Sequence, residues 1–192
     1  MDNPFTGTVA ILGLGYIGLP TAVALATRGI EVIGVDVNPA TVESVNAGHV
    51  PFVEPDLAVA VSGAVSMGRL TASLTVPEAD AYIIAVPTPF QADHTADLSY
   101  IKTATTQLAP LLRGGELVVL ESTSPPGTTE QLSRWLAELR PDLHMPHEPD
   151  GVPDICIAHC PERVLPGRIM IEMVTNDRVI GGIAIEIGRA HV

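Results

Sequence analysis

Three glycines near the amino terminus, Gly13, Gly15 and Gly18, are spaced as G-x-G-x-x-G. They follow a short β-branched run and precede an alanine-rich stretch, where a strand is expected to turn into a helix. In such a turn the first glycine permits a tight bend, the second lets backbone approach a pyrophosphate, and the third lets the helix pack against the strand. Backbone N–H groups and the helix dipole can then hold the anion without lysine or arginine. The spacing predicts a dinucleotide-binding turn.

One carboxylate is placed to select the dinucleotide. Asp36 directly follows the predicted strand 31–35, eighteen residues after Gly18. A carboxylate at this point accepts hydrogen bonds from the adenosine ribose hydroxyls and repels a 2′-phosphate, so we expect NAD to be preferred to NADP. The alternative is a purely structural turn beside a surface aspartate, and the strand–turn–helix context disfavours it.

The elements that must position these residues alternate between strand and helix. Strands are predicted at 8–12, 31–35, 81–86, 116–121 and 155–159, and helices at 16–28, 39–47, 98–112 and 129–139, with a short helix after Pro55. This alternation is typical of βαβ units whose parallel sheet is buried on both faces. We predict an α/β fold, a Rossmann-like doubly wound parallel sheet, in a single domain over residues 1–182. Residues 183–192 contain no recognisable element, and we expect them to be an atypical tail foreign to the domain.

The composition excludes several classes of protein. Apolar residues make up 46% of the 192 residues and charged residues 17%, which suits a folded domain with a sizeable core. Ten basic residues against 22 acids give a formal charge of −12 without any basic run, so neither a nucleic acid nor an anionic membrane is expected as a partner. No apolar stretch reaches membrane length, and the first residues lack a basic leader. The two cysteines form no disulfide framework, which favours a reducing cytoplasm.

Two other kinds of site match some residue types but not their placement. Cys156, His159 and Cys160 could suggest a metal centre, but in a strand the two cysteines face one side and the histidine the other, so we expect no metal. Glu121 and Glu162 could suggest the carboxylate pair of a glycosidase. A phosphate-binding turn, however, has no role in glycoside hydrolysis.

Five further motifs occur in order along the chain: EPDL at 54–57, VPTP at 86–89, DLSY at 97–100, ESTSPPGTT at 121–129 and CPERVLPG at 160–167. Three of them follow predicted strands, at the sheet edge where ligands of such folds bind. Together with the glycine turn they resemble the UDP-glucose/GDP-mannose dehydrogenase family over about residues 6–182. The PERVLPG string is most similar to the branch that acts on UDP-N-acetyl-D-mannosamine.

The resemblance implies an NAD-dependent oxidation of the C6 alcohol of a UDP-sugar to a carboxylate in two steps. In such enzymes two hydrides pass to NAD, and a cysteine thiolate holds the intermediates as a thiohemiacetal and then a thioester. Family members associate mainly through a central helix. The resemblance therefore implies a UDP-sugar as substrate and a homodimer for the full-length protein.

Roles for individual residues follow from the same resemblance. It implies that Thr123 and Glu162 are catalytic, with Glu162 as the base for the hydrolytic water. Arg163 and Val164 would contact the UDP-sugar. One of Thr128 and Thr129 would cap the helix that they open, and Thr129 would face the cofactor. A second family glutamate is replaced here by Pro166, which disfavours UDP-glucose and GDP-mannose as substrates. The full set implied to bind NAD is Gly13, Gly15, Tyr16, Ile17, Gly18, Asp36, Thr88, Thr123 and Thr129.

The family's catalytic lysine, asparagine and cysteine have no counterpart in these 192 residues. Lys102 is the only lysine and lies outside the matching motif, so we expect it to be a solvated helix residue. We therefore expect this chain to bind NAD without turnover. Two alternatives stay open: a dehydrogenase of UDP-glucose or of another UDP-N-acetylhexosamine, and a non-catalytic module that senses NAD.

Overall fold

A computed structural model describes residues 5–54, 56–165 and 167–183 of the chain. The strands are β1 (Thr8–Leu12), β2 (Glu31–Val35), β3 (Leu70–Ser73), β4 (Ala81–Ile84), β5 (Leu117–Leu120), β6 (Cys156–His159) and β7 (Gly181–Gly182). The helices are α1 (Gly18–Ala26), α2 (Pro39–Asn46), α3 (Leu57–Ser66), α4 (Ser99–Leu108), the 3₁₀ helix η1 (Ala109–Leu111), α5 (Thr128–Leu139) and α6 (Ile169–Thr175). Of the predicted tail, all but the first residue lies outside the described residues, as does Pro166.

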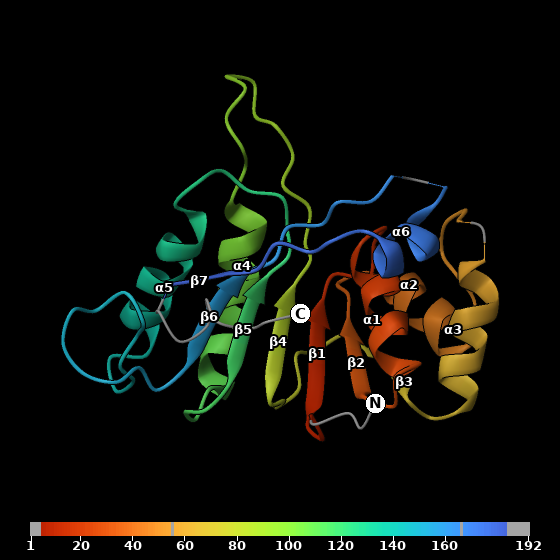
Figure 1. Ribbon diagram of the computed structural model, residues 1–192, viewed down its shortest axis with the longest axis horizontal. Coiled ribbons are helices and arrows are strands. Elements are labelled where there is room, and N and C mark those ends of the chain that lie inside the picture. Colours follow the sequence, from red (N-terminus) through yellow and green to blue (C-terminus); the bar gives the residue numbers. More distant parts are fainter. Residues whose placement is uncertain (1–4, 55, 166, 184–192) are drawn as a thin grey trace.

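The strands form one sheet in the order β3-β2-β1-β4-β5-β6-β7 (Figure 1). Strands β1 to β6 are parallel, and the short β7 pairs with β6 in the antiparallel direction. The predicted Rossmann-like, doubly wound sheet in a single domain is thus confirmed. The strand order reverses between the neighbours β1 and β4, and at such a point the loops after the two strands diverge. A ligand site is expected at that position on the carboxyl edge of the sheet.

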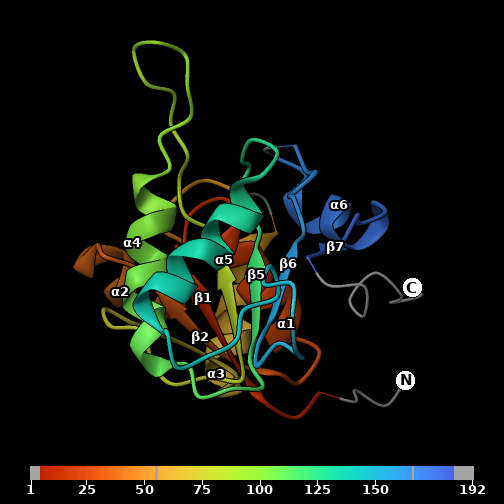
Figure 2. The same cartoon turned by 90° about the vertical axis from the view of Figure 1, so that its left-hand side faces the viewer.

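Both faces of the sheet are covered. One core joins alternate strand residues such as Leu12, Tyr82 and Leu120 to α4 and α5, and the other joins residues such as Val9 and Ile11 to α1 and α3. Figure 2 shows α4 and α5 on one side of the sheet and α1 and α6 on the other. Because strand residues are buried in both directions, the strands are almost continuously apolar, which is why they could be located from the sequence.

Three elements have no counterpart among those predicted. Strand β3 lies at the sheet edge and buries only Leu70 fully, so it lacks an apolar run. Helix α6 and the two-residue strand β7 follow the last motif, where no periodic pattern marks them. The helix predicted at 98–112 ends earlier, at Leu108, and continues as η1. Pro110 lies at its start, where proline is tolerated because the missing N–H is not needed.

Candidate functional site

The turn after β1 has the backbone that its glycines predict. Gly13 has a φ of +100°, and a Cβ there would lie 2.5 Å from the carbonyl oxygen of Ala85. A Cβ at Gly18 would lie 1.9 Å from the Gly13 carbonyl oxygen, so the start of α1 packs directly on the turn. A Cβ at Gly15, in contrast, would meet nothing within 4 Å. Open space beside backbone N–H groups is what a bound pyrophosphate needs, and the turn fits this ligand.

Asp36 connects the end of β2 to the glycine turn. Its Oδ2 accepts the Leu14 N–H at 3.0 Å, and its Oδ1 accepts the Asn38 N–H at 2.9 Å. An ionised carboxylate has about four acceptor positions, so two remain for the hydroxyls of a ribose. The carboxylate is therefore held in place by backbone while it keeps its capacity to bind a ligand.

Two adjoining cavities lie along the carboxyl ends of the strands. The first, of about 310 Å³, extends from the glycine turn to the ends of β4 and β5, and the second, of about 570 Å³, extends from the end of β2 to α4. Both are lined by Gly13, Asp36, Val86 and Pro87, so they meet beside the turn. An elongated ligand with two halves on either side of a pyrophosphate suits this arrangement.

The first cavity brings together most of the residues predicted from the sequence. Its lining includes Gly13, Gly15, Tyr16, Ile17, Asp36, Thr88, Thr123 and Glu162. Gly18 contributes from behind the turn, through its contact with Gly13. Tyr16 is half-exposed, and its ring lies 4.3 Å from that of Phe52, centroid to centroid.

Three of the residues predicted from the sequence do not line either cavity. Thr129, Arg163 and Val164 are absent from the lining of both cavities, and their roles stay predictions. The prediction that a threonine caps α5 is wrong: the N-cap is Gly127, without a side-chain hydrogen bond. The Thr128 hydroxyl instead donates to the Pro125 carbonyl at 2.8 Å, because Gly127 in the left-handed region turns the chain back on itself before the helix begins.

The loops after β4 and β5 are fastened to each other beside the first cavity. The Thr88 hydroxyl donates to the Thr123 carbonyl at 2.6 Å, and the Ser122 hydroxyl donates to the Val86 carbonyl at 2.8 Å. The Thr88 hydroxyl thus uses its one proton in a hydrogen bond within the protein. Toward a ligand it can therefore act only as a hydrogen-bond acceptor. Thr123 is an exposed residue that lines the cavity.

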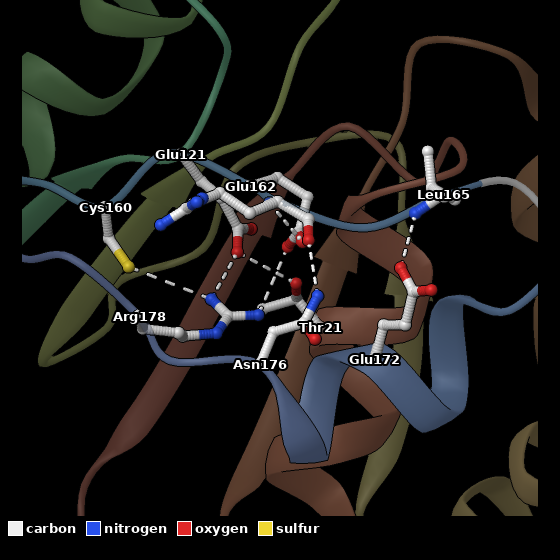
Figure 3. Close-up of polar contacts among 9 residues, drawn as sticks. Thr21, Glu121, Cys160, Glu162, Leu165, Glu172, Asn176 and Arg178 are labelled. Atoms are coloured by element: carbon white, nitrogen blue, oxygen red, sulfur yellow. Dashed lines mark hydrogen bonds and ion pairs between the residues drawn. The ribbon is translucent and has the colours of Figure 1, made fainter.

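A charged cluster that the sequence did not predict includes Glu121 and Glu162, which line this cavity (Figure 3). Arg178 donates to Glu121 Oε1 at 3.0 Å, to Glu162 Oε2 at 3.2 Å and to Cys160 Sγ at 3.8 Å. The side chains of Glu121 and Glu162 are only 2% and 6% exposed. Burial raises the pKa of the Glu121 carboxyl, and hydrogen bonds from Arg178 and Thr21 offset this only in part. Burial likewise raises the pKa of the Cys160 thiol.

Sequence patterns contain a partial signal for this cluster. Glu121 directly follows the strand β5 and is buried, where an acid is unusual unless it is paired. Arg178 lies between α6 and β7, outside every recognised motif, and only the three-dimensional structure brings it to Glu121 and Glu162. In the part of the chain that the structure describes, no group of three or more His, Cys, Asp and Glu side chains could hold a metal ion. None of the helices described is long and apolar enough to span a bilayer.

Asp36→Ala is expected to weaken NAD binding by about 10- to 100-fold, because hydrogen bonds to a charged group contribute about 1.5–3 kcal/mol. Discrimination against NADP should be lost with the negative charge. Calorimetric titration of both dinucleotides into the variant measures this. Asn38→Ala is the control: it removes the side chain that caps α2 at Ala40 N–H, 3.0 Å away, and leaves the carboxylate in place. Equal NAD affinity in Asp36→Ala and wild type would contradict the role of Asp36.

Comparisons with known proteins agree with this geometry. The model of the UDP-glucose/GDP-mannose dehydrogenase family, NAD binding domain, matches residues 7–190. The chain is 55% identical over 175 residues to UDP-N-acetyl-D-mannosamine dehydrogenase of Escherichia coli (strain K12), covering 91% of this chain and 42% of that protein. It is 57% identical over 175 residues to NDP-N-acetyl-D-galactosaminuronic acid dehydrogenase of Ralstonia nicotianae, covering 91% and 41%.

A solved structure supports the same relationship. UDP-N-acetyl-mannosamine dehydrogenase from Staphylococcus aureus superimposes with a TM-score of 0.85 at 37% identity, over 95% of this chain and 44% of that chain. The present chain thus spans about 42% of the length of the curated relatives that it matches. With the glycine turn, Asp36 and the paired cavities in place, the chain belongs to the UDP-glucose/GDP-mannose dehydrogenase family and comprises its NAD binding domain.

Proposed function

We propose that the full-length protein oxidises C6 of UDP-N-acetyl-D-mannosamine to the uronate with two molecules of NAD, and that this chain is its cofactor-binding part. The observation that carries the proposal is the 55% identity to the E. coli enzyme of that name across 91% of the chain. An intact glycine turn with Asp36 at the end of β2 supports the use of NAD.

The chain's own residues bind and orient the cofactor. Backbone N–H groups after Gly13 and the amino end of α1 would hold the pyrophosphate, and Asp36 would accept hydrogen bonds from the adenosine ribose hydroxyls. The second cavity, which residues of α4 line, would receive the adenine. When bound in this way, NAD supplies the hydride acceptor for each oxidation. Thr88 and Thr123 border the nicotinamide half, and Thr129 faces the cofactor.

Glu162 and Thr123 act at the reactive end of the first cavity. Glu162 Oε1 accepts the Arg163 N–H at 2.6 Å, and Oε2 accepts from Arg178 at 3.2 Å, so both carboxyl oxygens are held in place. From this position Glu162 takes a proton from the water that hydrolyses the acyl intermediate. The Thr123 hydroxyl positions that water or the substrate oxygen, and Arg163 and Val164 contact the UDP-sugar. The thiol nucleophile and the catalytic lysine come from beyond these 192 residues.

A second candidate substrate has an observation in its favour. The Ralstonia relative, at 57% identity, is named for an N-acetyl-D-galactosaminuronic acid product. Both candidates are nucleotide-linked N-acetylhexosamines that differ in stereochemistry at the sugar. The residues that distinguish the two sugar stereochemistries are expected in the sugar-binding part of the protein, outside this chain.

The test is to assay a panel of UDP-sugars with the full-length protein and with the 192-residue chain. The proposal predicts NADH formation by the full-length protein with UDP-N-acetyl-D-mannosamine, at two NADH per sugar, and none by the chain alone. A preference for UDP-N-acetylgalactosamine would select the second candidate, whereas a preference for UDP-glucose would contradict both. NAD binding without NADH formation from any UDP-sugar would instead indicate an NAD-sensing module.

The assembly and location of the full-length protein are part of the proposal. We infer a cytoplasmic homodimer, supported by the family resemblance and by two cysteines that are both free thiols. Analytical ultracentrifugation of the full-length protein should give the dimer mass, and a monomer at assay concentration would contradict this inference.

A further inference from the structure

The segment that follows the CPERVLPG motif folds back and makes hydrogen bonds to residues of that motif. From helix α6, Glu172 Oε2 accepts the Leu165 N–H at 2.9 Å. Just after α6, Asn176 donates from its side-chain amide to the Arg163 carbonyl at 2.8 Å. Arg178 then reaches Glu162 itself (Figure 3). These three hydrogen bonds therefore hold residues 162–165 against the segment 172–178.

Arg178 differs from the other two supports because it also reaches a second strand end. Its Nη1 donates to Glu121 after β5, while its Nη2 donates to Glu162 after β6. Glu121 Oε1 also accepts the Thr21 hydroxyl of α1 at 3.0 Å, and its Oε2 is buried without a partner. One guanidinium thus faces two nearly buried carboxylates and one buried thiol, that of Cys160.

Two adjacent buried carboxylates cannot both stay ionised without a compensating cation. In the described part of the chain, Arg178 is the cation paired with either carboxylate, and Thr21 and Cys160 carry no charge that could replace it. Burial acts against the charge of the guanidinium, yet its contacts with the carboxylates raise the pKa of Arg178 above its ordinary value. The charge state of this end of the cavity therefore depends on one residue.

We propose that Arg178 is the positioning residue of the reactive end: it holds Glu162 at the cavity wall and balances the negative charge of Glu121 beside it. A base must be held beside the water that attacks, and Arg178 meets this condition through its contact with Glu162. The role of Glu162 as the base for the hydrolytic water rests on the proposed function. The contacts of Arg178 and the coupling of its charge to the carboxylates do not depend on which substrate the protein uses.

The experiment is an NMR titration of the glutamate side-chain carboxyl carbons in the 192-residue chain, with Glu121 and Glu162 assigned from their glutamine variants. In Arg178→Met, Glu121 should titrate at a pH higher by about one unit or more than in wild type, because an adjacent cation lowers a carboxyl pKa by about 1–3 units. Arg178→Lys should restore most of the difference, since it returns the charge without the two nitrogen donors that reach separate carboxylates.

Arg134→Met is the matched control. Arg134 pairs with Glu130 on the exposed surface of α5, so this variant loses the same charge and a side chain of the same size. It should leave the titration of Glu121 unchanged. An unchanged titration in Arg178→Met would overturn the proposal.

A double variant covers the case in which Arg178→Met folds but is too unstable for the pH titration. Arg178→Met with Glu121→Gln removes one of the two buried charges, and the proposal predicts a higher unfolding temperature than for the single variant. A double variant no more stable than the single one would contradict charge coupling. NAD binding by the wild-type chain, measured separately, tests the proposed function and does not depend on either result.

Discussion

Gly15→Ala is expected to remove most NAD binding while leaving the fold intact. A Cβ at this position meets nothing within 4 Å, and Gly15 does not have a positive φ, so alanine fits the free protein. The same Cβ would occupy the space through which a pyrophosphate approaches the backbone. Overpacking of this kind costs about 1–3 kcal/mol, so NAD affinity should fall by about 5- to 150-fold.

Calorimetry with NAD and a thermal melt of the same sample measure both parts of this expectation. Gly63→Ala, in α3, is the matched control, because its Cβ also meets nothing within 4 Å and lies away from both cavities. That variant should bind NAD like wild type and gain up to about 1 kcal/mol of stability from its helical position. If Gly15→Ala bound NAD as tightly as wild type, the pyrophosphate could not lie beside Gly15.

Gly18→Ala is expected to act on the fold itself. The added Cβ would lie 1.9 Å from the Gly13 carbonyl oxygen and 3.2 Å from the Ala85 Cβ. Because the nearest atom is backbone, α1 must move away from the turn, at a cost of about 3 kcal/mol. For a chain of this size the unfolding midpoint should fall by about 6–12 °C.

Differential scanning calorimetry measures this loss, with Gly15→Ala as the control in the same turn. The two alanine variants should thus differ in effect: Gly15→Ala should lose NAD affinity, and Gly18→Ala should lose stability. A Gly18→Ala protein with the wild-type midpoint would show that α1 and the turn are not in contact.

The parts of the fold that position the cofactor could be predicted because local rules determine them. The glycine spacing, Asp36 and the apolar strands on either side are each set within a few residues of sequence. The capping of α2 by Asn38, with Pro39 at the first helical position, is of the same kind. Such features do not depend on distant parts of the chain.

The parts that could not be predicted depend on distant contacts. Strand β3 exists because it pairs with β2, not because its own four residues favour a strand. Arg178 is 57 residues from Glu121 in the sequence, and no local pattern connects them. Glu54 is a similar case: its carboxylate accepts the N–H groups of Gly167 and Ile169, at 2.9 and 3.0 Å, and so fastens the end of the CPERVLPG motif to a different loop.

The central claim is that this chain binds NAD along the carboxyl edge of its sheet, with Asp36 selecting it over NADP. Isothermal titration of NAD and NADP into the purified 192-residue chain tests it most directly. We predict saturable binding of one NAD per chain, at least about tenfold tighter than NADP because Asp36 repels the 2′-phosphate. Absence of NAD binding, or equal affinity for the two dinucleotides, would contradict it.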